Sequence, residues 1–501
     1  MRHKLVFPAL IVILGFPPFS TLISAQAASS VKSKSSAALP LSASPKALRL
    51  MDRVWKLNSD EVEQEKGCVV LRKIVSIDPN FAVAHELLAQ FSLDPAEQVS
   101  EQRKAVESKH FATPAEQLLV EWFQAAADHD LLPAISDMNE LLGRYPHDRW
   151  VVMLANFWLT QETQYERAAE VFENSGLTSP GMLNNAAYTY AYMRQFDKAF
   201  ALMEQYVAAM PKVSNPQDSY AEILRMAGHY NQAIVHYRAA LAINPNFYMS
   251  QFGIADTYAL MGQEARARQE YELGFHKFPM PALHQVQWRN REAFTYIWEG
   301  DLKGADQAFQ SIADFAHSNK MGQVEADTYR QMAQYQPDPV RALGFLDKAE
   351  TAIQLHENAM AIAVQQEEAQ ILRARVEVAV KQGDQESAKA ALDKLNGLSQ
   401  VSSDKLIATA YHAAAGALLF SQHKYTDAIS HLEEDTDNPL SLRLLTAAYQ
   451  KSGNLENAKH MGEVLASLNV PTLEQAMIVP AFRECIKNAS CDAATVNASL
   501  K

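Results

Sequence analysis

The sequence has few of the residues and motifs on which most enzymes depend. Only three cysteines and 18 glycines occur in 501 residues. It contains no phosphate loop of the form G-x-x-x-x-G-K and no nucleophile elbow of the form G-x-S-x-G. No run of alternating β-branched residues predicts a strand, and no two histidines have the i, i+4 spacing of a zinc-peptidase helix. We therefore expect a helical protein with no catalytic residues, no cofactor and no bound metal ion.

The N-terminus has the three parts of a secretory signal peptide. Residues 2–4 are Arg, His and Lys, residues 5–16 form a short apolar run, and Ala25-Gln26-Ala27 supplies a small-x-small cleavage site. We expect cleavage before Ala28, and export to the periplasm or the extracellular medium. Residues 19–23 could extend the apolar run, so a retained N-terminal anchor is the alternative.

Acidic residues outnumber basic ones, and this balance disfavours nucleic acid as a partner. The chain has 45 Lys and Arg against 58 Asp and Glu, a net charge of −13. Loss of residues 1–27 removes two basic residues and no acidic ones, which brings the net charge to −15. Because such a surface repels a polyanion, we expect no nucleic-acid partner. Residues 28–46 are rich in Ser, Ala and Lys and predict a flexible linker.

Seven prolines recur with a nearly constant spacing. Successive steps are 35, 32, 34, 31, 34 and 34 residues. Because proline lacks an N–H and disfavours helix before it, we expect each proline to end the second helix of a helix-turn-helix unit. A period of about 34 residues is typical of the tetratricopeptide repeat. The prolines are Pro79, Pro114, Pro146, Pro180, Pro211, Pro245 and Pro279.

Other residue types keep the same period. An alanine series allows two helices to approach closely, and a bulky residue follows each alanine four positions later on the same face. The alanines are Ala134, Ala168, Ala199, Ala233 and Ala267, and the bulky residues are Met138, Phe172, Met203, Tyr237 and Tyr271. These columns resemble the tetratricopeptide family over residues 115–280. The resemblance implies an all-α, right-handed superhelical solenoid of antiparallel helix pairs.

The repeat signal weakens on both sides of residues 115–280. Residues 47–114 predict divergent helices, in which Gly67 and Cys68 stand near the place of the usual alanine. Residues 281–480 predict longer, irregular repeats, because the alanine steps become 38, 37, 46, 40 and 30. A different helical hairpin repeat is the alternative for this part. Residues 481–501 are expected to form a C-terminal tail.

The tail contains two of the three cysteines. Cys485 and Cys491 stand six residues apart, and an exported protein meets oxidising conditions. We therefore expect a disulfide between them, with two free thiols as the alternative. Cys68 is expected to be a small core residue.

One stripe of the first helices, opposite the packing columns, is the candidate binding site. Its residues recur at spacings of 3 and 4 along each helix. The resemblance implies that this stripe lines a concave groove that grips a protein or peptide partner, and a concave face without a dedicated ligand is the alternative. The stripe consists of Met153, Phe157, Asn184, Tyr188, Tyr192, Asp218, Glu222, Arg225, Phe252 and Asp256.

These features predict an exported, non-enzymatic adaptor or scaffold that binds a protein or peptide partner. An accessory or substrate-presenting subunit of an envelope secretion or polysaccharide system is the second hypothesis. A hydrolase in the irregular C-terminal half is a remote third one, since no motif supports it.

Overall fold

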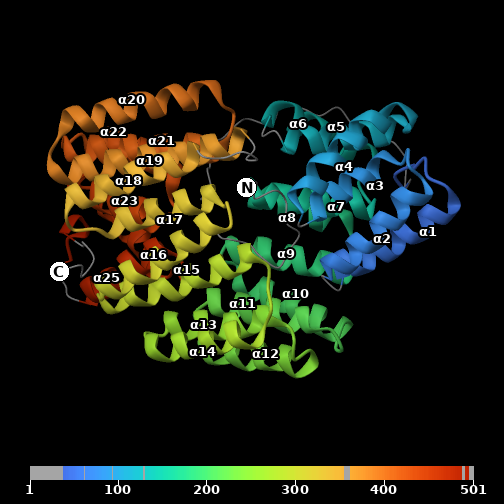
Figure 1. Ribbon diagram of the computed structural model, residues 1–501, viewed down its shortest axis with the longest axis horizontal. Helices are drawn as coiled ribbons and strands as arrows, with labels where there is room; N and C mark the ends of the chain where they lie inside the picture. The colour runs from blue at the N-terminus through green and yellow to red at the C-terminus, as the bar shows by residue number, and fades with distance from the viewer. Residues whose placement is uncertain are drawn as a thin grey trace. The chain divides into compact units, whose positions relative to one another are not determined.

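The computed structural model describes residues 38–60, 63–92, 94–127, 130–354, 361–487 and 491–495. The predicted signal peptide and residues 28–37 of the predicted linker lie outside these ranges. Every regular element within them is a helix, so the predicted all-α fold is confirmed (Figure 1). No helix among them combines the length and the apolar character that a membrane span requires. Contacts divide the chain into two compact units, with described parts 38–223 and 224–495.

The N-terminal unit consists of consecutive helix pairs, and the two helices of each pair contact one another. A π-helical turn, η1 (Lys56–Asp60), follows the first helix, and a short 3₁₀ turn, η2 (Lys109–Phe111), follows the fourth. The pairs are α1 (Pro45–Trp55) with α2 (Gln64–Ile77), α3 (Ala82–Phe91) with α4 (Pro95–Ser108), α5 (Pro114–Ala127) with α6 (Leu131–Arg144), α7 (Arg149–Gln161) with α8 (Tyr165–Ser175), and α9 (Pro180–Tyr192) with α10 (Phe196–Ala209).

Helix α11 (Ser214–Met226) spans the boundary between the two units, which falls between residues 223 and 224. Helix α12 (Tyr230–Ile243) is the first helix that lies wholly in the C-terminal unit, and it is the second helix of its pair. Helix pairs follow, and α25 (Leu473–Lys487) comes after the last of them. The pairs are α13 (Tyr248–Leu260) with α14 (Glu264–Lys277), α15 (Ala282–Glu299) with α16 (Leu302–Ser318), α17 (Gly322–Tyr335) with α18 (Pro339–Gln354), α19 (Ala361–Gln382) with α20 (Gln385–Val401), α21 (Lys405–Ser421) with α22 (Tyr425–Leu432), and α23 (Pro439–Ser452) with α24 (Leu455–Ala466). Two 3₁₀ turns are η3 (Glu433–Asp435) and η4 (Ala493–Thr495).

The alanine column is confirmed, and it extends through the irregular half. From α6 onward an alanine stands at the fourth position of each second helix and is buried, so that the partner helix can approach closely. These residues are Ala134, Ala168, Ala199, Ala233, Ala267, Ala305, Ala342, Ala388, Ala428 and Ala458. Gly67 holds the same position in α2, where a Cβ would overlap the side chain of Asn58.

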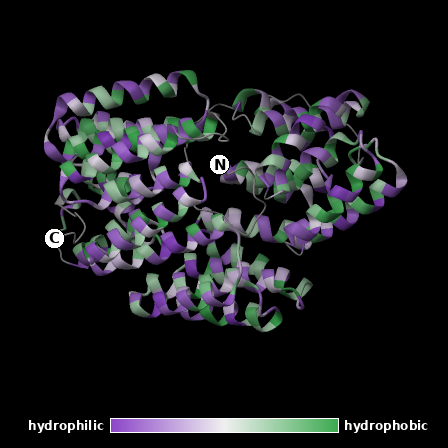
Figure 2. Ribbon diagram, viewed as in Figure 1, coloured by the Kyte–Doolittle hydropathy of each residue, from purple (hydrophilic) through white to green (hydrophobic). Residues whose placement is uncertain are grey.

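The first and second helices of the pairs differ in burial. Helices α3, α7 and α13 are buried almost all round, whereas the second helices keep one exposed face. Figure 2 shows hydrophobic and hydrophilic residues interleaved along the ribbons, as helices with one solvated face require. Among the described residues, the exposed large hydrophobic side chains lie on second helices, apart from Phe111 and Ile486.

Two of the seven prolines have a different place from the predicted one. Five of them follow the end of a second helix by two residues, as expected. Pro114 and Pro180 instead are the first residues of α5 and α9. Proline is favoured at the first helical position because an N–H there has no intrahelical acceptor. These two prolines therefore keep the period of the repeat although they begin a helix.

Part of the predicted linker belongs to the folded N-terminal unit. Leu39 is buried and its backbone N–H donates to the Asp148 carboxylate at 2.8 Å, and the Ser44 N–H donates to Asp78 at 2.7 Å. Helix α1 then begins at residue 45, so residues 38–46 are not a linker. The physical reason is the apolar side chain of Leu39, which packs against the core with its neighbour Leu41.

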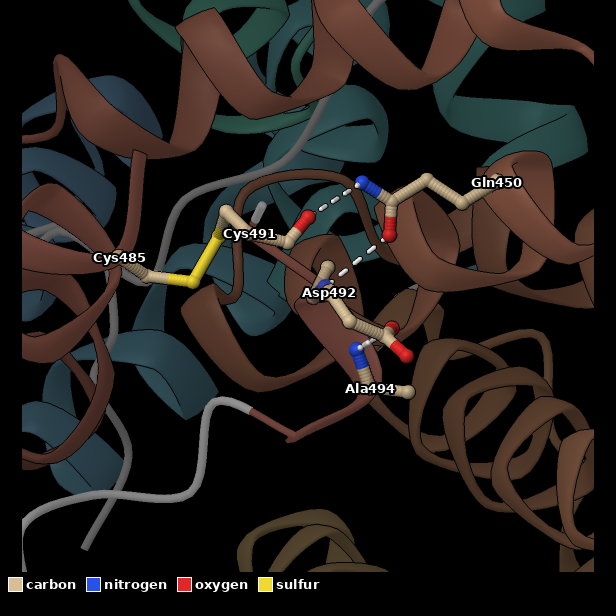
Figure 3. Close-up of a disulfide and its surroundings, with 6 residues drawn as sticks. Gln450, Cys485, Cys491, Asp492 and Ala494 are labelled. Atoms are coloured by element: carbon tan, nitrogen blue, oxygen red, sulfur yellow. Dashed lines mark hydrogen bonds between the residues drawn. A yellow bond between two sulfur atoms is a disulfide. The ribbon is translucent and has the colours of Figure 1, made fainter. Parts of the chain in front are cut away.

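Helix α25 is the last core element of the C-terminal unit and contacts α15, α23 and α24. Its buried residues include Ile478, Val479 and Phe482. Because this helix continues to residue 487, the predicted tail begins later than residue 481. A disulfide joins Cys485 at the end of α25 to Cys491 (Figure 3).

The disulfide holds a short segment against α23. The Gln450 side chain donates to the backbone oxygen of Cys491 and accepts from the N–H of Ala493 (Figure 3). Lys451 forms an ion pair with Asp492 at 2.7 Å. The third cysteine, Cys68, is buried and free, and burial raises the pKa of its thiol to about 12.

Candidate partner-binding surface

Most of the predicted groove stripe in the N-terminal unit is inside the fold. Met153, Phe157, Asn184, Tyr188 and Asp218 are buried, and only Tyr192 and Glu222 are partly exposed. These residues contact other parts of the same unit, as the next three observations show.

The Met153 sulfur accepts a hydrogen bond from Ser59 at 3.0 Å. Tyr188 donates its hydroxyl to Glu222 at 2.8 Å, and burial raises the pKa of Tyr188 well above its usual value. Tyr192 stacks on Tyr165 with 5.5 Å between ring centroids. The prediction that these residues line an open groove is wrong.

The part of the stripe in the C-terminal unit is a buried ionic cluster. Asp256 is 0% exposed and accepts from Arg225 at 3.0 Å, from Arg291 and from the hydroxyl of Tyr271. Arg225 is only 2% exposed. Phe252 is also buried and lies parallel to Trp288, with ring centroids 4.6 Å apart. Arg225 and Tyr188, two residues of the predicted stripe, therefore hold the repeats together.

Most of the stripe residues are buried because of the way in which the helix pairs stack. Contacts join α3 to α5, α7 to α9, α17 to α19 and α19 to α21, so successive first helices lie side by side. A stripe at spacings of 3 and 4 on one first helix then meets the next first helix. In the C-terminal unit, the residues Arg225, Asp256 and Arg291 stand 31 and 35 apart, which is about one repeat.

The chain's own ends cover further parts of the first helices. In the N-terminal unit, Trp55 of α1 packs edge-on against Trp150 of α7, with 4.8 Å between the ring centroids. Asp60 of η1 accepts a hydrogen bond from the N–H of Gly181 in α9. In the C-terminal unit, Asn469 accepts from the hydroxyl of Tyr230 and donates to a backbone oxygen near the end of α11. None of these contacts is foreseeable from the repeat pattern.

An open recess of about 760 Å³ lies between the second helices α16 and α18. Met332 and Phe345 give it an apolar base, and a polar rim surrounds this base. The exposed backbone of Gly344 in the middle of α18 also faces it. The other lining residues are Asp306, Gln307, Gln310, Ser311, Asp314, Arg341 and Lys348.

Ionic and aromatic contacts fix the rim of the recess. Asp306 pairs with Arg341 at 2.7 Å and accepts from the hydroxyl of Tyr335 at 2.9 Å. Burial, together with the charge of Asp306, raises the pKa of Tyr335 well above its usual value. The ammonium group of Lys348 lies 5.5 Å from the ring centre of Phe345. The rim therefore offers both signs of charge around an aromatic base.

Gly344 contributes no side chain to the recess. A glycine in a helix interior costs roughly 0.5–1 kcal/mol relative to alanine. A Cβ built on Gly344 would meet no atom within 4 Å, so the space beside it is open. A recess of this volume, with an apolar base and seven polar side chains around it, has room for a side chain or short segment of another molecule.

The recess could not be recognised in the sequence. A mid-helix glycine is a weak signal, because Gly397 in α20 is also an exposed glycine inside a helix. The lining residues come from helices whose order along the chain is known, but nothing in their spacing shows that the side chains leave a hollow.

The repeated helix pairs and the alanine column place the chain among the all-α helix-pair repeat proteins. No family model matches the sequence, and no curated protein matches it either. Solved structures that match include tetratricopeptide repeat proteins, all at low identity.

Yeast Tom70 is 14% identical, with 88% of this chain and 96% of that chain covered at a TM-score of 0.38. A tetratricopeptide repeat protein from Parabacteroides merdae is 12% identical, with 61% and 100% covered at a TM-score of 0.34. PilW, described as a type IV pilus biogenesis factor, is 12% identical, with 46% and 93% covered at 0.28. All three TM-scores lie below 0.5, and the fold described above rests on the chain's own helix pairs.

Proposed function

We propose that this protein is an exported, non-enzymatic scaffold that binds a protein partner in the recess between α16 and α18. The observation that supports this proposal most directly is the recess itself, which combines an apolar base at Met332 and Phe345 with a charged rim. Stacked helix pairs offer a large rigid surface, and this suits a scaffold.

Export is proposed from the N-terminal sequence alone. Residues 2–4, the apolar run that follows and Ala25-Gln26-Ala27 form a cleavable signal. Intact mass spectrometry of the protein recovered from its native compartment should give a chain that begins at Ala28. A mass that still includes residues 1–27 would show a retained anchor.

The recess is tested by filling it. Gly344→Trp places an indole in the open space beside α18, whereas Gly397→Trp adds the same group to an exposed site on α20. Gly344→Ala adds only a methyl group and serves as a second control. Each variant is immobilised as the mature chain and exposed to an envelope extract, and the captured proteins are compared by mass spectrometry.

We expect one protein to be captured by the wild type, by Gly344→Ala and by Gly397→Trp. The Gly344→Trp variant should not capture that protein. Binding of that protein to the purified chain should then be measured directly. If every variant captures the same proteins equally well, the recess is not the binding site.

A further inference from the structure

Two histidines from neighbouring helices face each other in the irregular half of the chain. His412 lies on α21 and His431 on α22, and their Nδ1 atoms are 3.0 Å apart. The ring centroids are 5.0 Å apart, and Tyr411 contacts both rings edge-on. Both side chains are partly exposed, so small solutes can reach them.

A close Nδ1–Nδ1 contact restricts the protonation of the pair. One ring can donate its Nδ1 proton to the other only if the second ring is neutral and has its proton on Nε2. Two protonated rings would repel each other at this distance. The two Nδ1 atoms therefore have room for one shared proton, or for a cation in its place.

The charged groups around the pair favour a cation on balance. Asp427 lies one turn before His431 on the same helix, and Glu434 follows in η3. Lys405 and Glu433 act on Glu434 with opposite effects. The two carboxylates that act on His431 are therefore Asp427 and Glu434.

We propose that His412 and His431 form a two-histidine binding site for a divalent transition metal ion such as zinc. Neutral imidazole nitrogen is a preferred ligand of zinc, copper and nickel, whereas magnesium and calcium prefer oxygen. Nitrogens bound to zinc lie about 2.0–2.1 Å from it, so two of them in a tetrahedral site are about 3.4 Å apart. A rotation of both rings that turns the two Nδ1 lone pairs toward one shared point would widen the 3.0 Å contact to that separation.

The remaining coordination positions are left to water or to a group from another molecule. Among the described residues, no set of three or more histidine, cysteine or carboxylate ligands converges on one point. A metal ion held by two histidines is therefore open to exchange, which is typical of sites that bind reversibly or that a partner completes. The sequence gives no sign of this site, because the two histidines are 19 residues apart on different helices.

The test is a zinc titration of the untagged mature chain at pH 7.5 against a chromophoric zinc indicator. The wild type should bind one zinc ion through this pair, and His412→Asn and His431→Asn should each lose it. Asparagine keeps a polar group that can form the same hydrogen bond, so the fold should survive. His423→Asn and His460→Asn change exposed histidines on the same part of the chain and should keep the ion.

Three further measurements complete the test, and the first two guard against misfolded variants. Thermal unfolding without zinc should be the same for the wild type and for both site variants within a few degrees. A Cu²⁺ EPR spectrum of the wild type should show two coordinated imidazole nitrogens, with no substitution needed. Zinc should also be released between pH 7 and 5, because both Nδ1 atoms must be free of protons to bind it. Equal zinc binding by wild type and both site variants, or none by the wild type, would overturn the proposal.

Discussion

Replacement of Arg225 by alanine should destabilise the fold, because Arg225 is part of a buried cluster of charges. Its guanidinium lies 3.0 Å from the Asp256 carboxylate, and the two side chains are 3% and 0% exposed. Removing one partner of a buried ion pair typically costs 3–5 kcal/mol, because the other charge stays buried. Asp256 keeps its contact with Arg291, so we expect the lower end, about 3 kcal/mol.

The effect should be local, and hydrogen exchange can measure it. Peptides from α11 and α13 report the free energy of opening around the cluster. A loss of about 3 kcal/mol corresponds to roughly a hundredfold faster exchange, since each 1.4 kcal/mol is a factor of ten. A chain of this length need not unfold in one step, so a local probe is preferable to a single melting temperature.

Two controls separate the ion pair from other effects. Arg103→Ala removes an arginine that is 70% exposed on α4, and we expect it to change exchange in α11 and α13 hardly at all. The double variant Arg225→Ala with Asp256→Ala should cost less than the sum of the two single variants, because the two residues interact directly. Unchanged exchange in Arg225→Ala would refute the buried-cluster interpretation and restore Arg225 as a candidate for partner contact.

Three further predictions follow from particular residues. Gly262 has φ +71°, so Gly262→Ala should lower the free energy of unfolding by about 1 kcal/mol. Gly344 lies in a helix interior, so Gly344→Ala should raise the free energy of unfolding by about 0.5–1 kcal/mol. Shifts of the melting temperature with the same sign in both variants would contradict this pair of predictions. Burial raises the pKa of Glu292 from 4.5 to about 7, so its stabilising effect is present below pH 4.5 and is lost as pH rises through 7. Glu292→Gln should therefore raise stability by on the order of 1 kcal/mol at pH 8 and leave it unchanged below pH 4. Replacing Cys485 and Cys491 with serine should cost about 2 kcal/mol in the chain-entropy model, and faster exchange should be confined to the last residues.

The helix pairs could be predicted from the sequence because their signals are local and repeated. Ala233 and Tyr237 stand four residues apart on one face of α12, and the same arrangement recurs in neighbouring units. Each unit repeats the same steric requirement at the contact between its two helices, so a fixed period shows it. Ala388 in the irregular half meets the same steric requirement, because it is buried at the contact between its two helices although the repeat there is longer than 34 residues.

Most of the predicted stripe residues are buried because residues one repeat apart on successive first helices contact each other. Tyr188 and Glu222 are 34 residues apart, which is one repeat, and they are hydrogen-bonded. Arg225 and Asp256 carry opposite charges 31 residues apart. Residues one repeat apart on successive first helices are neighbours in a stacked array, so these pairs could have been predicted to contact one another. The contact between Tyr230 and Asn469 spans 239 residues, and no local pattern contains it.

The lengths of the helices indicate which part of the chain has helical surface that is not used in packing the repeats. In the regular repeats, first helices such as α7, α9 and α13 have 13 residues, and nearly all of α7 and α13 are buried between their neighbours. In the C-terminal unit, α16, α20 and α21 have 17 residues and α19 has 22. One turn needs 3.6 residues, so the first helix α21 is about one turn longer than these first helices and α19 is about two turns longer. The recess on α16 and α18 and the histidine pair on α21 and α22 both belong to the C-terminal unit. Substitutions in the regular repeats should therefore act mainly on stability, and those that change binding without loss of stability should fall between residues 302 and 432.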